Sequence, residues 1–235
     1  MSTIYTLHYY FDPFCGWCYG AAPLLSQTER RVSELAKTGI QLNIRLHPGG
    51  MFSQPNCLPI SASFRAMTTH HDARIAQLTG QLFGQAYQQE LLFDTSRMLD
   101  SGPPSAAVLA AESLAGKGLA MLHSLQRSHY IDGLDITAAN ILLQQAEHLL
   151  PDPQAFMQCL ADTEQQLASQ FADTRQQMQR FGLPGFPALV LETADTAGRH
   201  TDSNHSLKVI SHQPFYGQPA AFADHLHSQL NLHGA

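Results

Sequence analysis

Two cysteines separated by two residues are the first feature of this chain that could do chemistry. Cys15 and Cys18 enclose Gly16 and Trp17 in the segment YYFDPFCGWCY, Tyr9–Tyr19. Such a pair can form a reversible disulfide, supply half of a zinc site, or pack as two apolar side chains. The thiolate is the nucleophile in disulfide exchange, and the unpaired N–H groups of a helix N-terminus favour an anion. A redox role therefore requires a helix that begins beside the pair.

The elements predicted around the pair meet this requirement. The aromatic and β-branched run Ile4–Phe11 predicts a strand, and the apolar spacing of Ala21–Lys37 predicts a helix. Cys15 then lies at the end of the loop from strand to helix, and Cys18 lies about one helical turn further along on the same side. We therefore predict that Cys15 is the nucleophile and that Cys18 is the more buried, resolving thiol.

The other cysteines and the histidines do not complete a metal site. Structural zinc needs about four ligands, and the chain has four cysteines but a single CxxC pair. Cys57 and Cys159 stand alone, and the thirteen histidines are scattered. We predict no metal, and a zinc-stabilised or redox-inert binding module stays as the alternative from another class. Each lone cysteine is predicted to be a packed or idle thiol, with a secondary redox relay as the alternative.

The composition is that of an ordinary globular protein. Of the 235 residues, 44% are hydrophobic and 14% are charged, which excludes a disordered chain. The net charge of −6, with only 13 lysines and arginines, indicates neither a nucleic-acid partner nor an anionic membrane. No run approaches the roughly 18 apolar residues of a membrane span, and the first residues lack the pattern of a signal peptide. If the chain is complete as given, we expect a cytoplasmic protein.

The order of the predicted elements indicates a fold class. Strands are predicted at Ile4–Phe11, Ile40–Leu46, Pro187–Glu192 and Ser206–Ser211, with a hairpin connection over Thr193–His205. Helices are predicted at Ala21–Lys37, Ser63–Thr79, Gly84–Leu92, Ser105–Leu114, Gly118–Tyr130, Thr137–Leu149, Pro153–Phe181 and Gln218–Asn231. Without the Ala-, Leu- and Gln-rich helical block, the order is βαβ…ββα. A CxxC between the first strand and helix of a βαβ unit is typical of thioredoxin-like proteins.

The segment LPGFPALV, which precedes the third predicted strand, is the second informative stretch. An X–Pro bond is the only common route to a cis peptide, so the Phe186–Pro187 bond is a candidate for one. A proline is also tolerated at the first residue of a strand, where its missing N–H costs no ladder hydrogen bond. The segment alone is compatible with a simple turn as well.

Taken together, three segments resemble the DsbA family of the thioredoxin superfamily. They are FDPFCGWCYGAAP (Phe11–Pro23), HPGGMF (His47–Phe52) and GLPGFPALVLE (Gly182–Glu192). The nearest resemblance is to the cytoplasmic branch of predicted protein-disulfide isomerases, close to the FrnE-like proteins. It implies an α/β protein with a thioredoxin-like fold and an α-helical domain inserted after the second strand. Residues 1–58 and 183–235 would form the discontinuous thioredoxin-like domain, and residues 59–182 the helical insertion.

The resemblance also implies roles for the site residues. The CxxC pair would be the redox centre, and Pro187 would be a cis-proline that faces it. The backbone of Phe186 would be available to a substrate strand, and Gly16 and Trp17 would contact the substrate. The indole of Trp17 would either offer an apolar platform to the substrate or pack back against the helical insertion.

The activity implied is that of a thiol–disulfide oxidoreductase of the reductase or isomerase type. Periplasmic DsbA enzymes have an export signal and a Pro-His dipeptide between the cysteines, whereas this chain has no such signal and Gly-Trp there. Because Gly-Trp offers the thiolate no side-chain charge, we expect a more reducing pair. The expected substrate is a disulfide-containing protein or a small thiol. We expect no bound cofactor, and a thioredoxin or glutathione system as the reductant.

A second enzyme class shares the implied architecture. The kappa-type glutathione transferases and hydroxychromene-carboxylate isomerases use glutathione and usually carry serine in place of the CxxC pair. A glutathione-dependent transferase or isomerase is therefore the alternative among enzymes, and Cys15 and Cys18 point away from it.

Overall fold

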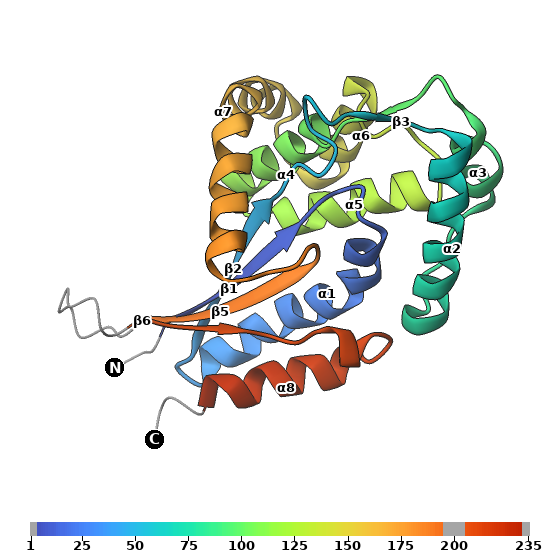
Figure 1. Ribbon diagram of the computed structural model, residues 1–235. Helices are drawn as coiled ribbons and strands as arrows, with labels where there is room; N and C mark the ends of the chain where they lie inside the picture. The colour runs from blue at the N-terminus through green and yellow to red at the C-terminus, as the bar shows by residue number, and fades with distance from the viewer. Residues whose placement is uncertain (1–3, 195–204, 232–235) are drawn as a thin grey trace.

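The computed structural model describes residues 4–194 and 205–231 and has a four-stranded sheet at its centre (Figure 1). β1 (Ile4–Phe11) runs parallel to β2 (Gln41–Pro48) and antiparallel to β5 (Ala188–Ala194). β6 (His205–Val209) pairs antiparallel with β5, so the strand order is β2-β1-β5-β6. The predicted strands are thus confirmed, with ends that differ by a few residues.

Two helices complete the thioredoxin-like core. α1 (Gly16–Lys37) connects β1 to β2, and α8 (Pro219–Asn231) packs beside it along one face of the sheet (Figure 1). The resulting βαβ…ββα arrangement confirms the predicted fold class. In this arrangement the CxxC pair lies where β1 ends and α1 begins, at one end of the strands.

The remaining helices form an insertion between β2 and β5, as predicted (Figure 1). Its elements are β3 (Leu58–Pro59), α2 (Ala62–Thr79), α3 (Gln85–Gln89), the 3-10 turn η1 (Leu91–Phe93), β4 (Met98–Leu99), α4 (Gly102–Ala115), α5 (Gly118–Tyr130), α6 (Ala139–Leu149) and α7 (Pro153–Arg180). α4 packs against both α5 and α7, and α7 also reaches the sheet at β2. The two-residue strands β3 and β4 are too short to leave a periodic pattern, and the sequence did not predict them.

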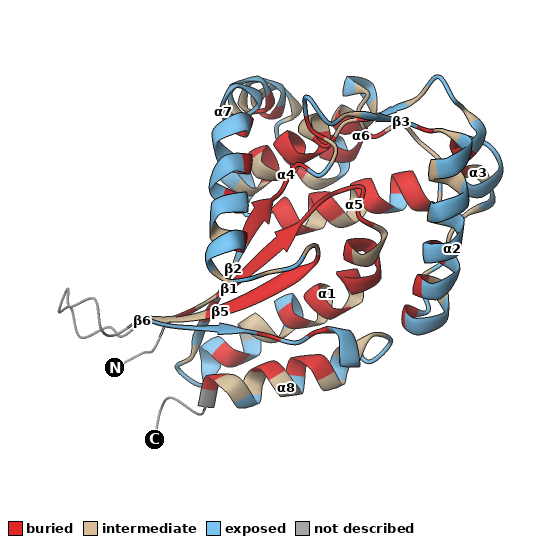
Figure 2. Cartoon of the chain, viewed as in Figure 1, coloured by how far each residue is buried: buried red, intermediate tan, exposed pale blue. Residues whose placement is uncertain are grey.

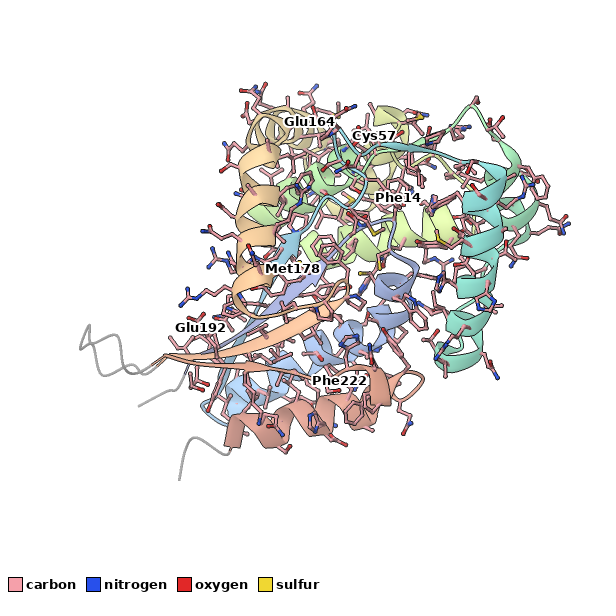
Figure 3. All side chains as sticks on the ribbon, in the orientation of Figure 1. Phe14, Cys57, Glu164, Met178, Glu192 and Phe222 are labelled. Atoms are coloured by element: carbon pink, nitrogen blue, oxygen red, sulfur yellow. The ribbon has the colours of Figure 1, made fainter. Side chains whose placement is uncertain are left out.

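The central strand β1 is buried on both faces, which explains its nearly continuous apolar sequence (Figure 2). On one face the hydroxyl of Tyr5 donates to the carbonyl of Leu230 on α8. On the other face the hydroxyl of Tyr10 donates to Gln177 on α7 at 2.9 Å. Met178 of α7 and Phe222 of α8 belong to separate apolar clusters on these two sides (Figure 3). The end of α7 therefore covers the face of the sheet that α1 and α8 leave open.

Helix α1 begins at Gly16 and not at Ala21, so the predicted start was wrong. The residues Gly16–Gly20 carry no amphipathic pattern, because Cys18, Tyr19 and Gly20 are buried and α2 packs closely against the two glycines. Pro23 lies inside the helix, and its missing N–H leaves the carbonyl of Tyr19 without its helical donor. The side chain of Gln81, just after α2, donates to that carbonyl at 2.8 Å. A side chain of the insertion thus supplies the hydrogen bond that Pro23 cannot donate within α1.

Two other helix boundaries also differ from the sequence prediction. α4 begins at Gly102 and not at Ser105, because the prolines that follow Gly102 fit the first turn of a helix, where no N–H is needed. The predicted helix Gly84–Leu92 divides into α3 and η1.

Most of the predicted hairpin connection, residues 195–204, lies outside the described residues. Within residues 4–194 and 205–231, no helix has the length and hydropathy to cross a membrane.

Candidate active site

Cys15 is the N-cap residue of α1, at the point where the chain turns from strand to helix. Its backbone N–H donates to the carbonyl of Asp12 at 3.1 Å. Its carbonyl accepts from the N–H groups of Cys18 and Tyr19 at 2.9 and 3.1 Å. The first turn of α1 therefore begins directly at Cys15, whose side chain makes no capping hydrogen bond to the helix.

Cys18 lies one turn further along α1 and is fully buried, whereas Cys15 keeps 7% of its surface exposed. Burial raises the pKa of the Cys18 thiol well above its usual range, and the neighbouring Cys15 raises it further. The backbone N–H of Asp12 acts in the opposite direction, because it hydrogen-bonds to the sulfur of Cys18. Both cysteines are free thiols in this structure. The two sulfurs thus differ in access to solvent.

The segment before β5 faces the sulfur of Cys15. The Phe186–Pro187 peptide bond is cis, and the carbonyl of Phe186 accepts the S–H of Cys15 at 3.5 Å. The aromatic ring of Phe186 occupies the space that a Cβ atom of Gly49 would need. Gly49 donates its N–H to the carbonyl of Phe11 at 2.9 Å. The end of β1, the turn after β2 and the Phe186 segment therefore meet at the redox pair.

A cavity of about 260 Å³ opens beside Cys15, between the thioredoxin-like core and the insertion. The core contributes Phe14, Cys15, Gly16, Trp17 and Phe186 to its lining. The insertion contributes mainly apolar side chains from α2, η1 and the end of α5, and the turn after β2 adds Met51 and Phe52. Cys18 is not among the lining residues. Of the CxxC pair, the cavity is therefore open to Cys15.

Asp12, directly after β1, fixes the loop that carries Cys15, and the sequence assigned it no role. Its carboxylate accepts from the N–H of Phe14 at 3.0 Å, from the N–H of Met51 at 2.6 Å and from the hydroxyl of Ser101 at 3.0 Å. Burial raises its pKa to about 6, although these hydrogen bonds and Arg175 oppose the shift. One buried carboxyl thus joins the loop before the CxxC pair to the turn after β2 and to the start of α4.

Asp72 on α2 is the second site residue that the sequence did not reveal. It is 6% exposed and lines the cavity, and it accepts a hydrogen bond from the hydroxyl of Tyr87 at 3.0 Å. Its other carboxyl oxygen lies 3.4 Å from the position that a Cβ atom on Gly16 would take. Burial raises its pKa to about 7, and the hydrogen bond from Tyr87 opposes this shift. The terminal methyl group of Ile75, also on α2, would lie only 3.0 Å from the same Cβ position, so the absence of a side chain at Gly16 lets α2 pack closely.

The raised pKa of Asp72 predicts a stability that falls with rising pH. An unfolded aspartate loses its proton near pH 4, whereas the folded carboxyl keeps it until about pH 7. The folded state therefore binds more protons between these values and loses stability as the pH rises through them. Asp72→Asn does not titrate and retains an acceptor for Tyr87. We expect this variant to be more stable than the parent at pH 8, by on the order of 2 kcal/mol, and its advantage to vanish near pH 4.

Urea unfolding of the reduced protein between pH 4 and pH 8 measures this difference. Asp173→Asn on the exposed surface of α7 is the matched control and should show no such trend. A difference between Asp72→Asn and the parent that stays constant across the pH range would contradict the prediction.

The other predicted site residues lie around the pair. Trp17 is half-buried, and its ring stacks on Tyr216 at 5.7 Å between centroids. The hydroxyl of Tyr216 donates to the carbonyl of Trp17 at 3.4 Å. The ring thus stacks on a residue of the C-terminal segment, and Trp17 also lines the cavity.

Cys57 and Cys159 stand apart from this arrangement. Neither lines the cavity, and burial together with Asp100 raises the pKa of the Cys57 thiol, which disfavours a reactive thiolate. The sulfur of Cys159 contacts the carbonyl of Ala110 on α4 at 3.9 Å. Among residues 4–194 and 205–231, no group of three or more His, Cys, Asp or Glu side chains could hold a metal ion. The redox pair is therefore without a ligand set for zinc in the part of the chain that the structure describes.

A sheet with a CxxC pair at a helix N-terminus and a cis-proline segment opposite defines a thioredoxin-like thiol–disulfide oxidoreductase. Residues 6–208 match the DSBA-like thioredoxin domain, and the chain belongs to this family. It is a DsbA-family enzyme with Cys15 and Cys18 as its CxxC pair. A comparison with curated protein sequences gave no significant match.

Solved structures of other proteins are similar to this chain over nearly its whole length. The cytosolic disulfide reductase DsbM from Pseudomonas aeruginosa is 42% identical, with 97% of this chain and 99% of that chain covered and a TM-score of 0.77. The structure of DsbM with GSH matches at 41% identity, 96% and 99% coverage and a TM-score of 0.76. A structure from Nitrosomonas europaea, at 24% identity, covers 99% of this chain and 100% of its own with a TM-score of 0.72. That third likeness shows the fold alone.

Proposed function

We propose that the protein is a cytoplasmic disulfide reductase in which Cys15 attacks the substrate and Cys18 resolves the mixed disulfide. Attack by the Cys15 thiolate breaks the substrate disulfide, forms a mixed disulfide and releases one substrate thiolate. The Cys18 thiolate then attacks the sulfur of Cys15 and releases the second substrate thiolate. Two electrons pass to the substrate, and the enzyme is left with a Cys15–Cys18 disulfide. Release before resolution, with a different disulfide formed in the substrate, would be isomerisation by the same chemistry.

The observation that carries this proposal is the unequal access of the two sulfurs. Cys15 caps the helix and lines the cavity, whereas Cys18 is fully buried and does not line it. A bulky disulfide can therefore reach the first sulfur and not the second. The same asymmetry suits an intramolecular second step, because the mixed disulfide places its reactive sulfur one helical turn from Cys18.

The residues around Cys15 have roles in this proposal that follow from their positions. The carbonyl of Phe186 lies 3.5 Å from the sulfur and would accept a hydrogen bond from a substrate strand laid along the segment before Pro187. Gly16 and Trp17 line the cavity and would contact the side chains that flank the substrate disulfide. The segment 59–182 would act as a separate helical domain that forms the far wall of the cavity, against the domain made of residues 1–58 and 183–235.

We propose glutathione as the reductant that restores the dithiol. The first glutathione thiolate would attack the enzyme disulfide, and the second would release glutathione disulfide, so that two electrons return to the enzyme. The support is the likeness to DsbM, a cytosolic disulfide reductase with a structure that contains GSH. A thioredoxin system is the other candidate for this step. The substrate would be a disulfide-containing protein or small molecule.

The redox equilibrium of the pair with glutathione tests the proposal. After equilibration at several ratios of glutathione to its disulfide, free thiols are trapped by alkylation and counted by mass spectrometry. We expect one reversible disulfide between Cys15 and Cys18, with a potential nearer to the value of thioredoxin, about −270 mV, than to that of DsbA, about −120 mV. Cys15→Ser is the control and should form no such disulfide. A potential near that of DsbA, or no disulfide at all, would overturn the assignment as a reductase.

A further inference from the structure

The cavity beside Cys15 is lined by a single carboxyl group and by no lysine or arginine among the residues that the structure describes. The carboxyl group is that of Asp72 on α2, and most of the other lining side chains are aromatic or aliphatic. Two histidines, His71 and His129, also line the cavity, and burial lowers the pKa of His129 to about 4, so its ring is neutral. The cavity thus offers a ligand one acid and no permanent cation.

Asp72 uses only one of its carboxyl oxygens within the fold. Its Oδ2 atom accepts a hydrogen bond from the hydroxyl of Tyr87 at 3.0 Å. Its Oδ1 atom has no hydrogen-bond donor among the described residues, and it lies 3.4 Å from the place of a Cβ atom on Gly16. An ionised carboxylate accepts hydrogen bonds at both oxygens. The unused oxygen therefore lies next to the residue that follows the nucleophile.

Within residues 4–194 and 205–231, no basic side chain forms an ion pair with Asp72. Arg65, on the same helix, lies over the ring of Phe93 at 4.0 Å from its centroid. His71 precedes Asp72 directly, and adjacent residues on a helix do not face each other. A carboxylate that is only 6% exposed and has no cationic partner is costly. A positively charged group of a ligand would remove this cost.

We propose that Asp72 determines substrate specificity by binding an ammonium group, so that the preferred substrates are disulfides with a positive charge close to their sulfur atoms. This inference rests on the proposed function, because it requires Cys15 as the attacking thiol. Asp72 and Cys15 line the same cavity of about 260 Å³, so a small disulfide that fills it contacts both. The ammonium donates its N–H groups to the Oδ1 atom, and the apolar lining contacts the carbon atoms between nitrogen and sulfur. The bonds formed and broken remain those of the proposed reduction, and Asp72 transfers no proton.

Three small disulfides that differ in their end groups test this specificity. Cystamine carries ammonium groups, bis(2-hydroxyethyl) disulfide carries hydroxyl groups, and 3,3′-dithiodipropionate carries carboxylates. The value of kcat/KM is measured for each with glutathione as reductant at pH 8, where Asp72, with a pKa of about 7, is mostly ionised. Each value is divided by the rate constant of the same disulfide with free dithiothreitol, which corrects for intrinsic reactivity. We expect cystamine to exceed the hydroxyl compound about tenfold, the effect of one hydrogen bond to a charged group, and the carboxylate compound to be lowest.

Asp72→Asn removes the charge and retains an acceptor for the hydroxyl of Tyr87. In this variant the corrected ratio of cystamine to the hydroxyl compound should fall about tenfold, whereas a purely structural role would change both rates together. Asp173→Asn is the matched control, because it removes the same charge from the exposed surface of α7 and should keep the ratio of the parent. A ratio in Asp72→Asn within twofold of the parent would overturn the inference.

A second measurement needs only the parent protein and covers the case in which Asp72→Asn does not fold. The thioethers 2-(methylthio)ethylamine and 2-(methylthio)ethanol resemble halves of the first two disulfides and cannot exchange with a thiol. The amine should inhibit reduction of bis(2-hydroxyethyl) disulfide at a concentration about tenfold lower than the alcohol does. Equal inhibition by the two compounds would contradict a site for an ammonium group.

The rates of the parent protein also separate this inference from the proposed function. If the parent reduces none of the three disulfides, the proposed reductase activity fails and the inference fails with it. If the parent reduces all three in proportion to their rates with dithiothreitol, the reductase activity stands and only the role of Asp72 fails.

Discussion

Cys15→Ser is expected to lower the rate of disulfide reduction by roughly 10³-fold or more, because a serine hydroxyl does not ionise near neutral pH and cannot attack a disulfide. Cys18→Ser is expected to behave differently. It should retain the first attack and then accumulate the mixed disulfide on Cys15, since no thiol remains in reach to displace the substrate. Turnover of a protein disulfide with glutathione as reductant measures the first effect. Mass spectrometry of acid-quenched samples detects the trapped adduct of the second variant.

Cys57→Ser is the matched control for these two variants, because it removes a thiol that does not line the cavity. It should leave turnover within about twofold of the parent. Serine is close to cysteine in size, so the thermal unfolding of all three variants should remain cooperative. A trapped adduct on Cys18 in Cys15→Ser, in place of one on Cys15 in Cys18→Ser, would reverse the assigned roles.

Gly49→Ala is expected to lower the rate of disulfide reduction although it changes neither cysteine of the CxxC pair. A Cβ atom at this position would lie 1.9 Å from the Cζ atom of Phe186 and under 3.0 Å from two further ring atoms. The ring must therefore move, and it belongs to the residue whose carbonyl lies 3.5 Å from the sulfur of Cys15. We expect a loss of stability of about 1–3 kcal/mol, as for other overpacked cores. We also expect a fall in the rate of disulfide reduction of roughly tenfold to a hundredfold, because displaced positioning groups have effects of this size.

Gly185→Ala tests whether the effect is specific to that contact. It changes the residue directly before Phe186, yet a Cβ atom there would meet nothing within 4 Å. This variant should stay within about 0.5 kcal/mol of the parent in urea unfolding. Equal losses of activity in the two variants would show that the segment tolerates no added atom anywhere, which would contradict the specific role of the contact between Gly49 and Phe186.

Much of the fold was predictable from the sequence because its signals are local. The aromatic run of β1, the alternation in β2 and the apolar spacing along α1 and α8 each depend on neighbours within a few residues. Element order then followed directly, including the helical insertion after the second strand. The start of α1 was missed because its first turn is held by burial against distant elements, and local periodicity carries no trace of such contacts.

The candidate site likewise has features that the sequence predicts and contacts that depend on the tertiary structure. The sequence by itself determined the redox pair, its place at a helix N-terminus and the proline at position 187, because each depends on residue type and short spacing. Only the tertiary structure decided which groups surround the pair. It brought α2 of the insertion against Gly16 and the carbonyl of Phe186 beside the sulfur of Cys15. These contacts join segments far apart in the chain or on different elements, and they exist because the sheet, α1 and the insertion bury their apolar faces against one another.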